Sequence, residues 1–353
     1  MRKTAERILV GFSGGADSTA AVLLLREQGW DVTGLHFLVD PAEKSASVTA
    51  EKIADALEMP LILKDVSKRF DDIVIRNFCL EYRAGRTPNP CILCNPSVKF
   101  HVLCEEADRM GIFHIATGHY ARIHQDPKGN LFIKKGADSK KDQSYMLYRL
   151  TKDVLARTLF PLGGVDSKEE IRRYLEECGA PNARSEDSQD ICFIQSGAYQ
   201  EFLQERGVVS VPGPFKDRNG KILGMHGGIQ SYTPGQRKGL GIALGRPAYV
   251  VDIDSNKNTV ILGAEEELYR NRVELRDAFF TVHGSVDVLP EAYRDLPVEV
   301  KLRYTVKGAE AVLRQEGDSP ITVLFDRPQR APAPGQSAVF YVKDLLIGGG
   351  CIR

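Results

Sequence analysis

A short loop, Gly11-Phe-Ser-Gly-Gly-Ala-Asp-Ser18, carries the clearest chemical signal in the chain. Its glycines and Ser13 let backbone amides approach a ligand closely, and a helix beginning behind them would add its positive N-terminal end. Such a loop is suited to binding phosphate. Asp17 is placed to hold Mg²⁺ through an oxygen or a water, and the Ser18 hydroxyl can donate to a phosphate.

Two separated segments bring cysteine chemistry. Gly85-Arg-Thr-Pro-Asn-Pro-Cys91-Ile-Leu-Cys94-Asn95 is a stiff turn, because two prolines fix the backbone before a CxxC pair. Arg86 or Lys99 would favour ionisation of a thiol there, and a thiolate is both a nucleophile and a metal ligand. The sequence has no second CxxC and no HxxxH pair to complete a four-ligand zinc site.

The second segment holds Cys192 in an apolar Ile-Cys-Phe-Ile run, a pattern that by itself is typical of a buried core cysteine. Beside a phosphate-binding loop, however, two separated cysteines indicate sulfur transfer. One would carry a persulfide sulfur and the other would assist its release.

Strand and helix patterns alternate along the first part of the chain. We expect strands at 7–11, 32–39, 61–65 and 114–117, and helices at 18–28, 45–57, 70–84, 100–110 and, further on, from about 143 to 178. Alternation of this kind predicts an α/β fold with a parallel sheet and helices on both faces. Its ligand would lie beyond the carboxyl ends of the strands, where the phosphate loop falls.

The composition changes after residue 206, and three domains are expected. Residues 1–206 would form the α/β catalytic domain. Residues 207–270, rich in Gly and Pro with short β-like runs, would form a small β-rich central domain. Residues 271–353 contain alternating runs that predict a small antiparallel β-barrel.

The charge composition and the N-terminal sequence limit the classes of function that can be expected. Lys and Arg equal Asp and Glu at 47 each, which argues against a generic polyanion binder. The segment 121–157 holds nine Lys and Arg against four Asp, and from charge alone a solvated face is the favoured interpretation. The start lacks the long apolar segment of a signal peptide, and no apolar run is long enough to span a bilayer. We therefore expect a soluble, cytoplasmic protein whose seven cysteines are not a disulfide scaffold.

The phosphate loop resembles the SGGxDS loop of the ATP pyrophosphatases. It is not the P-loop GxxxxGK[ST], since no Lys follows, nor is it GxGxxG. ATP pyrophosphatases cleave ATP between the α- and β-phosphates and place AMP on an oxygen of their substrate. The loop alone leaves both amide-forming synthetases and tRNA-modifying enzymes open.

Motifs along nearly the whole chain narrow this choice, and the chain is similar to the bacterial tRNA-specific 2-thiouridylases. The matching segments are Gly11 to Ser18, Gly85 to Asn95, Thr117-Gly-His-Tyr120, Lys141-Asp-Gln-Ser-Tyr145, Asp190-Ile-Cys-Phe-Ile194, Gly235-Gln-Arg-Lys-Gly-Leu-Gly241, Arg303-Tyr304, Pro334-Gly-Gln336 and Gly348-Gly-Gly-Cys-Ile352. Their number and order make the resemblance specific.

The resemblance implies roles for particular residues. ATP contacts are implied for Gly11, Phe12, Ser13, Gly14, Gly15, Ala16, Asp17, Ser18, Phe37 and Gly118. Contacts to the target base are implied for Asn89, Pro90 and Cys91, and other tRNA contacts for His119, Lys141, Asp142, Gln143, Arg303, Tyr304 and Gln336. Cys94 matches the catalytic nucleophile and Cys192 the persulfide carrier. This chain departs from the family at Cys91, where many relatives carry Asp.

The implied reaction is 2-thiolation of the wobble uridine in the anticodon stem-loop of tRNAs for Glu, Gln and Lys. ATP with Mg²⁺ would adenylate O2 of the flipped uracil. Sulfur would come from a cysteine desulfurase or a persulfide relay protein and pass through Cys192, with Cys94 releasing the product and forming a disulfide.

Three alternatives remain open from sequence. Cys91, Cys94 and Cys192 are three thiolates that could hold a 4Fe-4S cluster whose fourth iron binds sulfide. A different ATP pyrophosphatase ligase would need an ammonia source and no cysteines. A non-enzymatic RNA-binding protein would bind tRNA without releasing pyrophosphate, which the intact loop with Asp17 and Ser18 disfavours.

Overall fold

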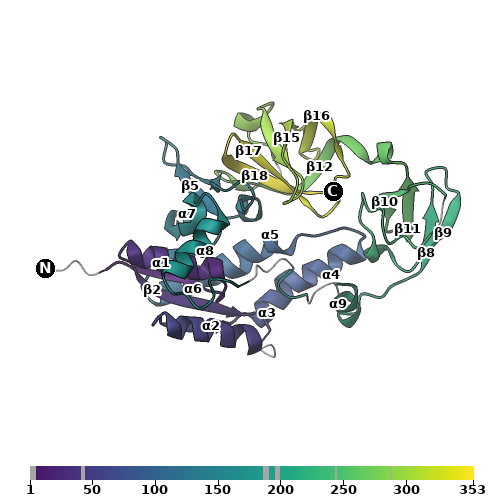
Figure 1. Cartoon of the computed structure of the whole chain (residues 1–353). Coiled ribbons are helices and arrows are strands. Elements are labelled where there is room, and N and C mark those ends of the chain that lie inside the picture. Colours follow the sequence, from purple (N-terminus) through teal and green to yellow (C-terminus); the bar gives the residue numbers. More distant parts are fainter. Residues whose placement is uncertain (1–4, 41–43, 186–190, 195–198, 243–244, 287) are drawn as a thin grey trace. The chain divides into compact units, whose positions relative to one another are not determined.

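The computed structural model of the chain describes residues 5–40, 44–185, 191–194, 199–242, 245–286 and 288–353. These residues gather into two compact units (Figure 1). The first unit contains residues 1–74, 91–189 and 344–347. The second contains residues 75–90, 190–343 and 348–353. Each unit is therefore assembled from segments that are distant in the sequence.

A five-stranded parallel sheet forms the centre of the first unit. Its order is β3 (Leu61–Asp65), β2 (Asp31–Leu38), β1 (Arg7–Gly11), β4 (His114–Thr117) and β7 (Thr158–Leu159). At the carboxyl end of β1, Gly11 is in register with Leu35 on one side and Thr117 on the other. The predicted α/β fold with a parallel sheet is confirmed.

Helices surround this sheet. They are α1 (Ala16–Glu27), α2 (Lys44–Ala56), α3 (Ser67–Phe70), α5 (Pro90–Cys94), α6 (Phe100–Arg109), α7 (Lys152–Arg157) and α8 (Lys168–Glu177), with π-helical turns at Asp71–Ile75 and Asn95–Lys99 and 3₁₀ turns at Ser144–Leu147 and Pro161–Gly164. Helix α1 is buried on two faces. Val22 and Leu25 pack toward the sheet, whereas Ala16 and Ala20 pack with Ile171 of α8.

Two sequence expectations for this unit were wrong in detail. The helix expected from 143 to 178 is interrupted by β7, because Thr158 and Leu159 extend the sheet by pairing with Ile115 and Ala116. The hairpin of β5 (Ala121–Gln125) and β6 (Leu131–Lys135) was not anticipated, because its charged residues mask the apolar alternation.

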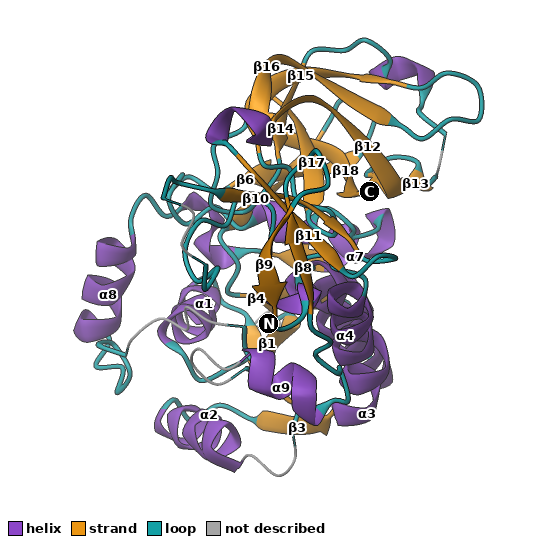
Figure 2. Ribbon diagram, turned by 90° about the vertical axis from the view of Figure 1, so that its right-hand side faces the viewer, coloured by secondary structure: helices purple, strands orange, loops and turns teal. Residues whose placement is uncertain are grey.

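The second unit begins with α4 (Arg76–Arg83), and α9 (Tyr199–Glu205) packs against it through Phe78 and Leu203. A four-stranded sheet follows in the order β10 (Tyr249–Asp254), β11 (Thr259–Gly263), β8 (Gly213–Lys216) and β9 (Ile222–His226), as Figure 2 shows in orange. Short 3₁₀ turns lie at Ile229–Ser231, Glu265–Leu268 and Glu291–Tyr293. The expected β-rich central part is confirmed.

The remaining strands close into a six-stranded barrel, as predicted. Its order is β12 (Tyr269–Phe280), β16 (Thr322–Arg330), β15 (Ala309–Arg314), β14 (Val298–Lys301), β17 (Ser337–Val342) and β18 (Leu345–Ile352), and a β12–β18 pairing closes it. The short β13 (Gly284–Ser285) adds to the edge of β12. The first residues of β18, Leu345 and Leu346, pair with β6 in the first unit. The domain boundaries at 206/207 and 270/271 stay a prediction.

Candidate active site

The phosphate loop joins β1 directly to α1. Gly14 has a φ of +79°, and a Cβ atom there would lie 2.8 Å from the Cα of Ala50. Only glycine meets both conditions without strain. Gly15 is the N-cap of α1 and has no side chain with which to cap the helix. The positive end of a 12-residue helix is therefore presented at the loop.

Two serine hydroxyls hold the turn in shape. Ser13 Oγ accepts a hydrogen bond from the Gly15 amide at 3.3 Å, and Ser18 Oγ donates to the Gly15 carbonyl at 3.0 Å. The two hydroxyls lie 3.1 Å apart. Behind them, the Phe12 carbonyl contacts Nδ1 of the buried His36 at 2.9 Å. The loop is thus pre-formed, which lowers the entropy that ordering on a ligand would cost.

Asp17 is the centre of a charged group at the start of α1. The Tyr120 hydroxyl donates to its Oδ1 at 2.8 Å, and the Lys168 ammonium lies 3.5 Å from the same oxygen. The Lys168 side chain is only 8% exposed, whereas that of Asp17 is 36% exposed. An accessible carboxylate beside a phosphate loop fits the way Mg²⁺ is usually held, by one or two carboxylates and the phosphates of its ligand.

The neighbouring strand ends complete this region. A Cβ atom at Gly118 would lie 2.9 Å from the Asp17 carbonyl oxygen, so the turn after β4 packs closely on the first turn of α1. Phe37, at the end of β2, is half-buried, and its ring lies 3.6 Å from a Cβ placed at Gly11. The sheet therefore brings together, beyond the carboxyl ends of β1, β2 and β4, the residues predicted to contact ATP.

The cysteines predicted to react differ in exposure. None of the seven cysteines, all of which the structure describes, is in a disulfide. Cys91 and Cys94 lie on the short helix α5, where Cys91 is half-buried and Cys94 is only 6% exposed. The next residue, Asn95, is buried and donates from Nδ2 to the Met146 carbonyl at 3.0 Å, which fixes the end of α5 within the first unit.

Cys192 belongs to the second unit and is exposed. The residues around it are not. Ile191, Phe193 and Ile194 pack into an apolar cluster, and the Phe193 ring meets that of Phe78 edge-to-face at 5.3 Å. The apolar Ile-Cys-Phe-Ile run therefore serves as an anchor that presents the thiol, rather than as the burial site that such a run usually indicates.

A pocket of about 220 Å³ lies wholly within the second unit. It is lined by Thr87, Asn89, Thr233, Arg303, Tyr304, Thr305 and Gln336. Four of these residues, Asn89, Arg303, Tyr304 and Gln336, are those that sequence motifs assigned to tRNA. Chain segments far apart in sequence thus converge on one concave surface that combines an aromatic ring, a guanidinium and amide groups.

Hydrogen bonds hold the pocket walls together. Gln336 donates from Nε2 to the Thr87 carbonyl at 2.6 Å, and the Thr87 and Thr233 hydroxyls lie 2.9 Å apart. Arg303 Nη2 donates to the carbonyls of Pro234 and Ala331 at 3.2 and 3.1 Å. Part of the guanidinium is therefore used to tie the loops together.

The other residues predicted to contact tRNA lie in the first unit. Asp142 is buried and accepts hydrogen bonds from the Gly136 and Ser144 amides, both at 3.1 Å. Gln143 accepts from the Tyr120 amide at 3.0 Å, and Lys141 is half-buried. Asp142 and Gln143 thus shape the turn in which they lie, and their contact with RNA stays a prediction.

His119 is half-buried beside aromatic rings. It stacks on Phe100 at 6.0 Å, and its Nδ1 lies 2.8 Å from the Thr117 hydroxyl. Burial, helped by the charge of Lys99, lowers the pKa of His119 to about 3. At neutral pH the imidazole is therefore uncharged, so it can hydrogen-bond to a nucleotide but cannot neutralise a phosphate.

Sequence reasoning missed Lys168, and a signal for it existed. Ser167 caps α8 by accepting from the Glu170 amide at 3.2 Å, which makes Lys168 the first residue of that helix. A cation is disfavoured at this position by the helix dipole. A lysine there is a weak signal by itself, since α2 and α7 also begin with lysine, and its burial beside Asp17 is what marks Lys168 in the structure.

Metal-binding clusters and membrane-spanning helices are absent from the described residues. Within the ranges given above, no group of three or more His, Cys, Asp or Glu is arranged to hold a metal ion. Of the helices in that part of the chain, none combines the length and hydropathy needed to cross a membrane.

Comparison with known proteins covers the whole chain. Residues 6–196 match the tRNA methyl transferase HUP domain, residues 200–264 the tRNA methyl transferase PRC-barrel domain, and residues 285–352 the aminomethyltransferase beta-barrel domain. The chain is 44% identical to tRNA-specific 2-thiouridylase MnmA 1 of Caldanaerobacter subterraneus subsp. tengcongensis, over 98% of each chain. It is 43% identical to tRNA-specific 2-thiouridylase MnmA of Acetivibrio thermocellus, over 99% of each chain.

Proposed function

Since this chain belongs to the family of tRNA-specific 2-thiouridylases, we propose that it uses ATP to replace the 2-oxygen of a tRNA uridine with sulfur. The substrate is the wobble uridine of tRNAs for Glu, Gln and Lys. The observation that carries the proposal is the pocket of the second unit. Three separate sequence motifs imply RNA contacts for Asn89, for Arg303 and Tyr304, and for Gln336, and these four residues line the same cavity.

The first step is adenylation of the base. Uracil O2 attacks the α-phosphorus of ATP, and the bond to pyrophosphate breaks. The loop amides and the N-terminal end of α1 stabilise the phosphate charge, and the Lys168 ammonium beside Asp17 would add positive charge at the same loop. Mg²⁺ held at Asp17 would supply further charge neutralisation on the phosphates.

The second step exchanges oxygen for sulfur. The terminal sulfur of a Cys192 persulfide attacks C2, and AMP leaves with the former O2. The Cys94 thiolate then attacks Sγ of Cys192, breaks the sulfur–sulfur bond and leaves 2-thiouridine. The product protein carries a Cys94–Cys192 disulfide, which an external dithiol reduces.

The exposure of Cys192 supports its role as the carrier, because a protein donor must reach the thiol to load it. The donor is a cysteine desulfurase or a persulfide relay protein in this proposal. A cytoplasmic location belongs to the same proposal, because the cycle needs reduced thiols.

The experiment that tests the proposal combines the purified protein with unmodified glutamate tRNA, ATP, Mg²⁺, a cysteine desulfurase, cysteine and a dithiol reductant under anaerobic conditions. The RNA is digested and 2-thiouridine is measured by mass spectrometry, with pyrophosphate followed in parallel. ATP-dependent 2-thiouridine at the wobble position is expected. Absence of both products from folded protein and folded tRNA would refute the proposal.

A second comparison separates the two routes for sulfur. The persulfide route predicts full activity of iron-free protein given a desulfurase and cysteine. The cluster route, with Cys91, Cys94 and Cys192 as ligands, predicts activity only in protein that contains iron and absorbs in the visible range. Iron analysis of the same anaerobic preparation decides between them.

A further inference from the structure

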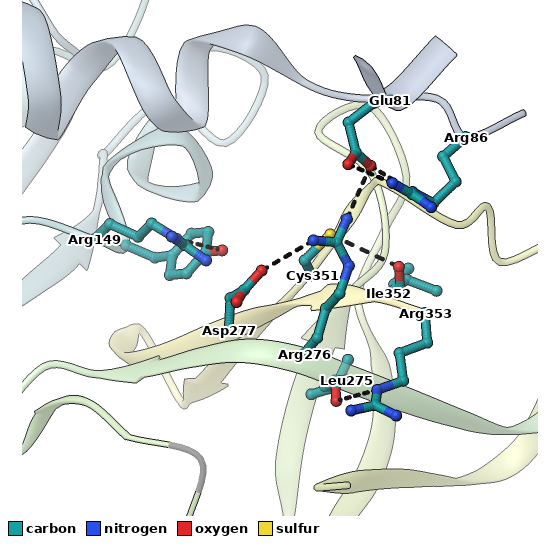
Figure 3. A network of polar contacts seen from close by, with 10 residues as sticks. Glu81, Arg86, Arg149, Leu275, Arg276, Asp277, Cys351, Ile352 and Arg353 are labelled. Atoms are coloured by element: carbon teal, nitrogen blue, oxygen red, sulfur yellow. Dashed lines mark hydrogen bonds and ion pairs between the residues drawn. The ribbon is translucent and has the colours of Figure 1, made fainter. Parts of the chain in front are cut away.

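The second unit contains a buried carboxylate that no step above uses. Glu81, near the end of α4, has a side chain that is 8% exposed. It accepts two parallel hydrogen bonds from Arg86, each at 2.7 Å, and a third from Arg276 of β12 at 2.8 Å (Figure 3). Arg276 also pairs with Asp277 at 3.0 Å. These three side chains, Glu81, Arg86 and Arg276, are called the Glu81 cluster below.

The Glu81 cluster is poorly explained as a source of stability. Burial raises the pKa of Glu81, but hydrogen bonds and charges from Arg86 and Arg276 outweigh this and leave the pKa below its ordinary value. The carboxylate is therefore ionised, and its desolvation offsets much of the attraction to the two arginines. Apolar residues of similar volume are often equally stable at such positions. A bidentate arginine pair does, however, fix geometry closely.

The geometry that the cluster fixes is that of segment 85–90. Gly85 has a φ of +67°, and a Cβ atom there would lie 2.7 Å from Cγ2 of Ile253, so the chain turns tightly at this point. Arg86 comes next and is held by Glu81. Thr87 then donates from its amide to the Pro334 carbonyl at 2.8 Å and accepts from Gln336. Asn89 follows at the wall of the pocket.

Segment 85–90 is thus held at its start by the cluster and in its middle by the barrel loop around Gln336. The two supports reinforce each other. Arg276 joins the carboxylate to the barrel, and the same barrel supplies Pro334 and Gln336. Releasing Arg86 would remove the first of these two supports from segment 85–90.

We infer that Glu81 is a positioning residue for the RNA pocket, acting through Arg86 to hold segment 85–90 and thereby Asn89 in place. Glu81 touches neither ATP nor the target base. Its removal weakens productive use of tRNA and leaves the ATP site intact. This inference rests on the proposed function for its RNA readout, whereas the state of segment 85–90 can be measured without it.

The test uses full-length variants with a matched control. Glu81→Gln keeps the shape of the side chain and removes its charge. Arg276→Gln leaves the Glu81–Arg86 pair intact and removes the link to the barrel together with the Arg276–Asp277 pair. The control is Glu106→Gln, because Glu106 is another buried carboxylate paired with two cations, Lys64 and Arg109, and lies in the first unit.

Three quantities are measured under conditions where every variant is folded: hydrogen exchange at the Thr87 amide, the dissociation constant for ATP, and kcat/KM for tRNA in the thiolation assay. Glu81→Gln is expected to speed exchange at Thr87, lower kcat/KM for tRNA about 100-fold and leave ATP binding unchanged. Arg276→Gln is expected to change the Thr87 exchange rate and kcat/KM for tRNA in the same direction but by a smaller factor. Glu106→Gln is expected to lower the unfolding midpoint only.

Normal Thr87 exchange and normal kcat/KM in folded Glu81→Gln would overturn the inference. Equal effects of Glu106→Gln on Thr87 exchange and on kcat/KM for tRNA would also overturn it. A general loss of stability would then be enough to explain the effects of Glu81→Gln. If the wild-type protein made no 2-thiouridine, the proposed function would fail, while the Thr87 comparison would still decide the positioning role.

Discussion

Two buried charged side chains, Lys168 and Glu81, are informative at the scale of the residue. Lys168 and Glu81 are each largely shielded from water and paired with an opposite charge. A buried charge costs free energy unless it is compensated, so its presence requires a local reason. Lys168 is paired with Asp17 at the phosphate loop, and Glu81 is paired with Arg86 and Arg276 beside segment 85–90, to which we have proposed that it gives its position.

The role of Lys168 leads to a binding prediction. Lys168→Met is expected to weaken Mg·ATP binding by about 1.5–3 kcal/mol, the usual value of a hydrogen bond to a charged group. This corresponds to about 10- to 100-fold in the dissociation constant, measured by calorimetry. Lys152→Ala is the matched control, because Lys152 also begins a helix but is exposed. Equal binding by Lys168→Met and wild type would remove Lys168 from the ATP site.

The two proposed cysteine roles predict losses at different stages. Cys192→Ser and Cys94→Ser should each abolish 2-thiouridine formation, while a single turnover of pyrophosphate release persists because adenylation comes first. Cys178→Ser is the control, since Cys178 is also exposed but belongs to the end of α8. Mass spectrometry of the RNA and a pyrophosphate assay check both outcomes. Turnover by either active-site variant with a physiological donor would contradict the assignment.

At the scale of elements, the sequence predicted best the strands and helices whose pattern of apolar residues indicates which residues are buried. The strands at Leu61–Asp65 and His114–Thr117 were predicted to the residue, because each is a short run bounded by turn residues. β7 was not predicted, because a run of two residues is too short to show a periodic pattern. Its residues form a strand because they pair with β4. Sequence motifs also identified pocket residues such as Asn89 and Gln336. Only the folded barrel brings these residues to the same pocket.

The close approach of two elements gives a second prediction for the ATP site. Gly118→Ala would place a methyl group 2.9 Å from the Asp17 carbonyl and push the turn after β4 away from α1. We expect a loss of about 1–3 kcal/mol in the free energy of unfolding, together with weaker ATP binding. Gly164→Ala is the control, since a Cβ there meets nothing within 4 Å. Urea unfolding and calorimetry measure the two effects, and similar behaviour of both variants would contradict the expected crowding.

At the scale of the whole molecule, each unit contains one buried carboxylate with two cationic partners. Hydrogen bonds from Lys64 and Arg109 lower the pKa of Glu106, and the arginines of the Glu81 cluster lower that of Glu81. A lowered folded-state pKa means that stability is present above the ordinary value of 4.5 and is lost as the pH falls through the folded-state value.

This linkage predicts how acid acts on the protein. At neutral pH, Glu106→Gln and Glu81→Gln should be less stable than the wild type. The difference in free energy of unfolding between the wild type and each variant should narrow as the pH falls below 4.5. The wild-type carboxylates then become protonated and, like the glutamines, carry no charge. Urea unfolding across a pH series checks this expectation. A difference in free energy of unfolding that stays constant down to the pH of acid unfolding would show that protonation of Glu81 and Glu106 does not cause the pH dependence of stability.

The pairing of β18 has a consequence for synthesis on the ribosome. Its first residues extend the β5–β6 hairpin of the first unit, and its later residues close the barrel against β12. A nascent chain that has not yet emerged as far as residue 352 therefore has an open barrel edge and an incomplete hairpin sheet. Translation that stops early would leave an unpaired strand edge in both units, a feature that exposes a protein to aggregation and proteolysis.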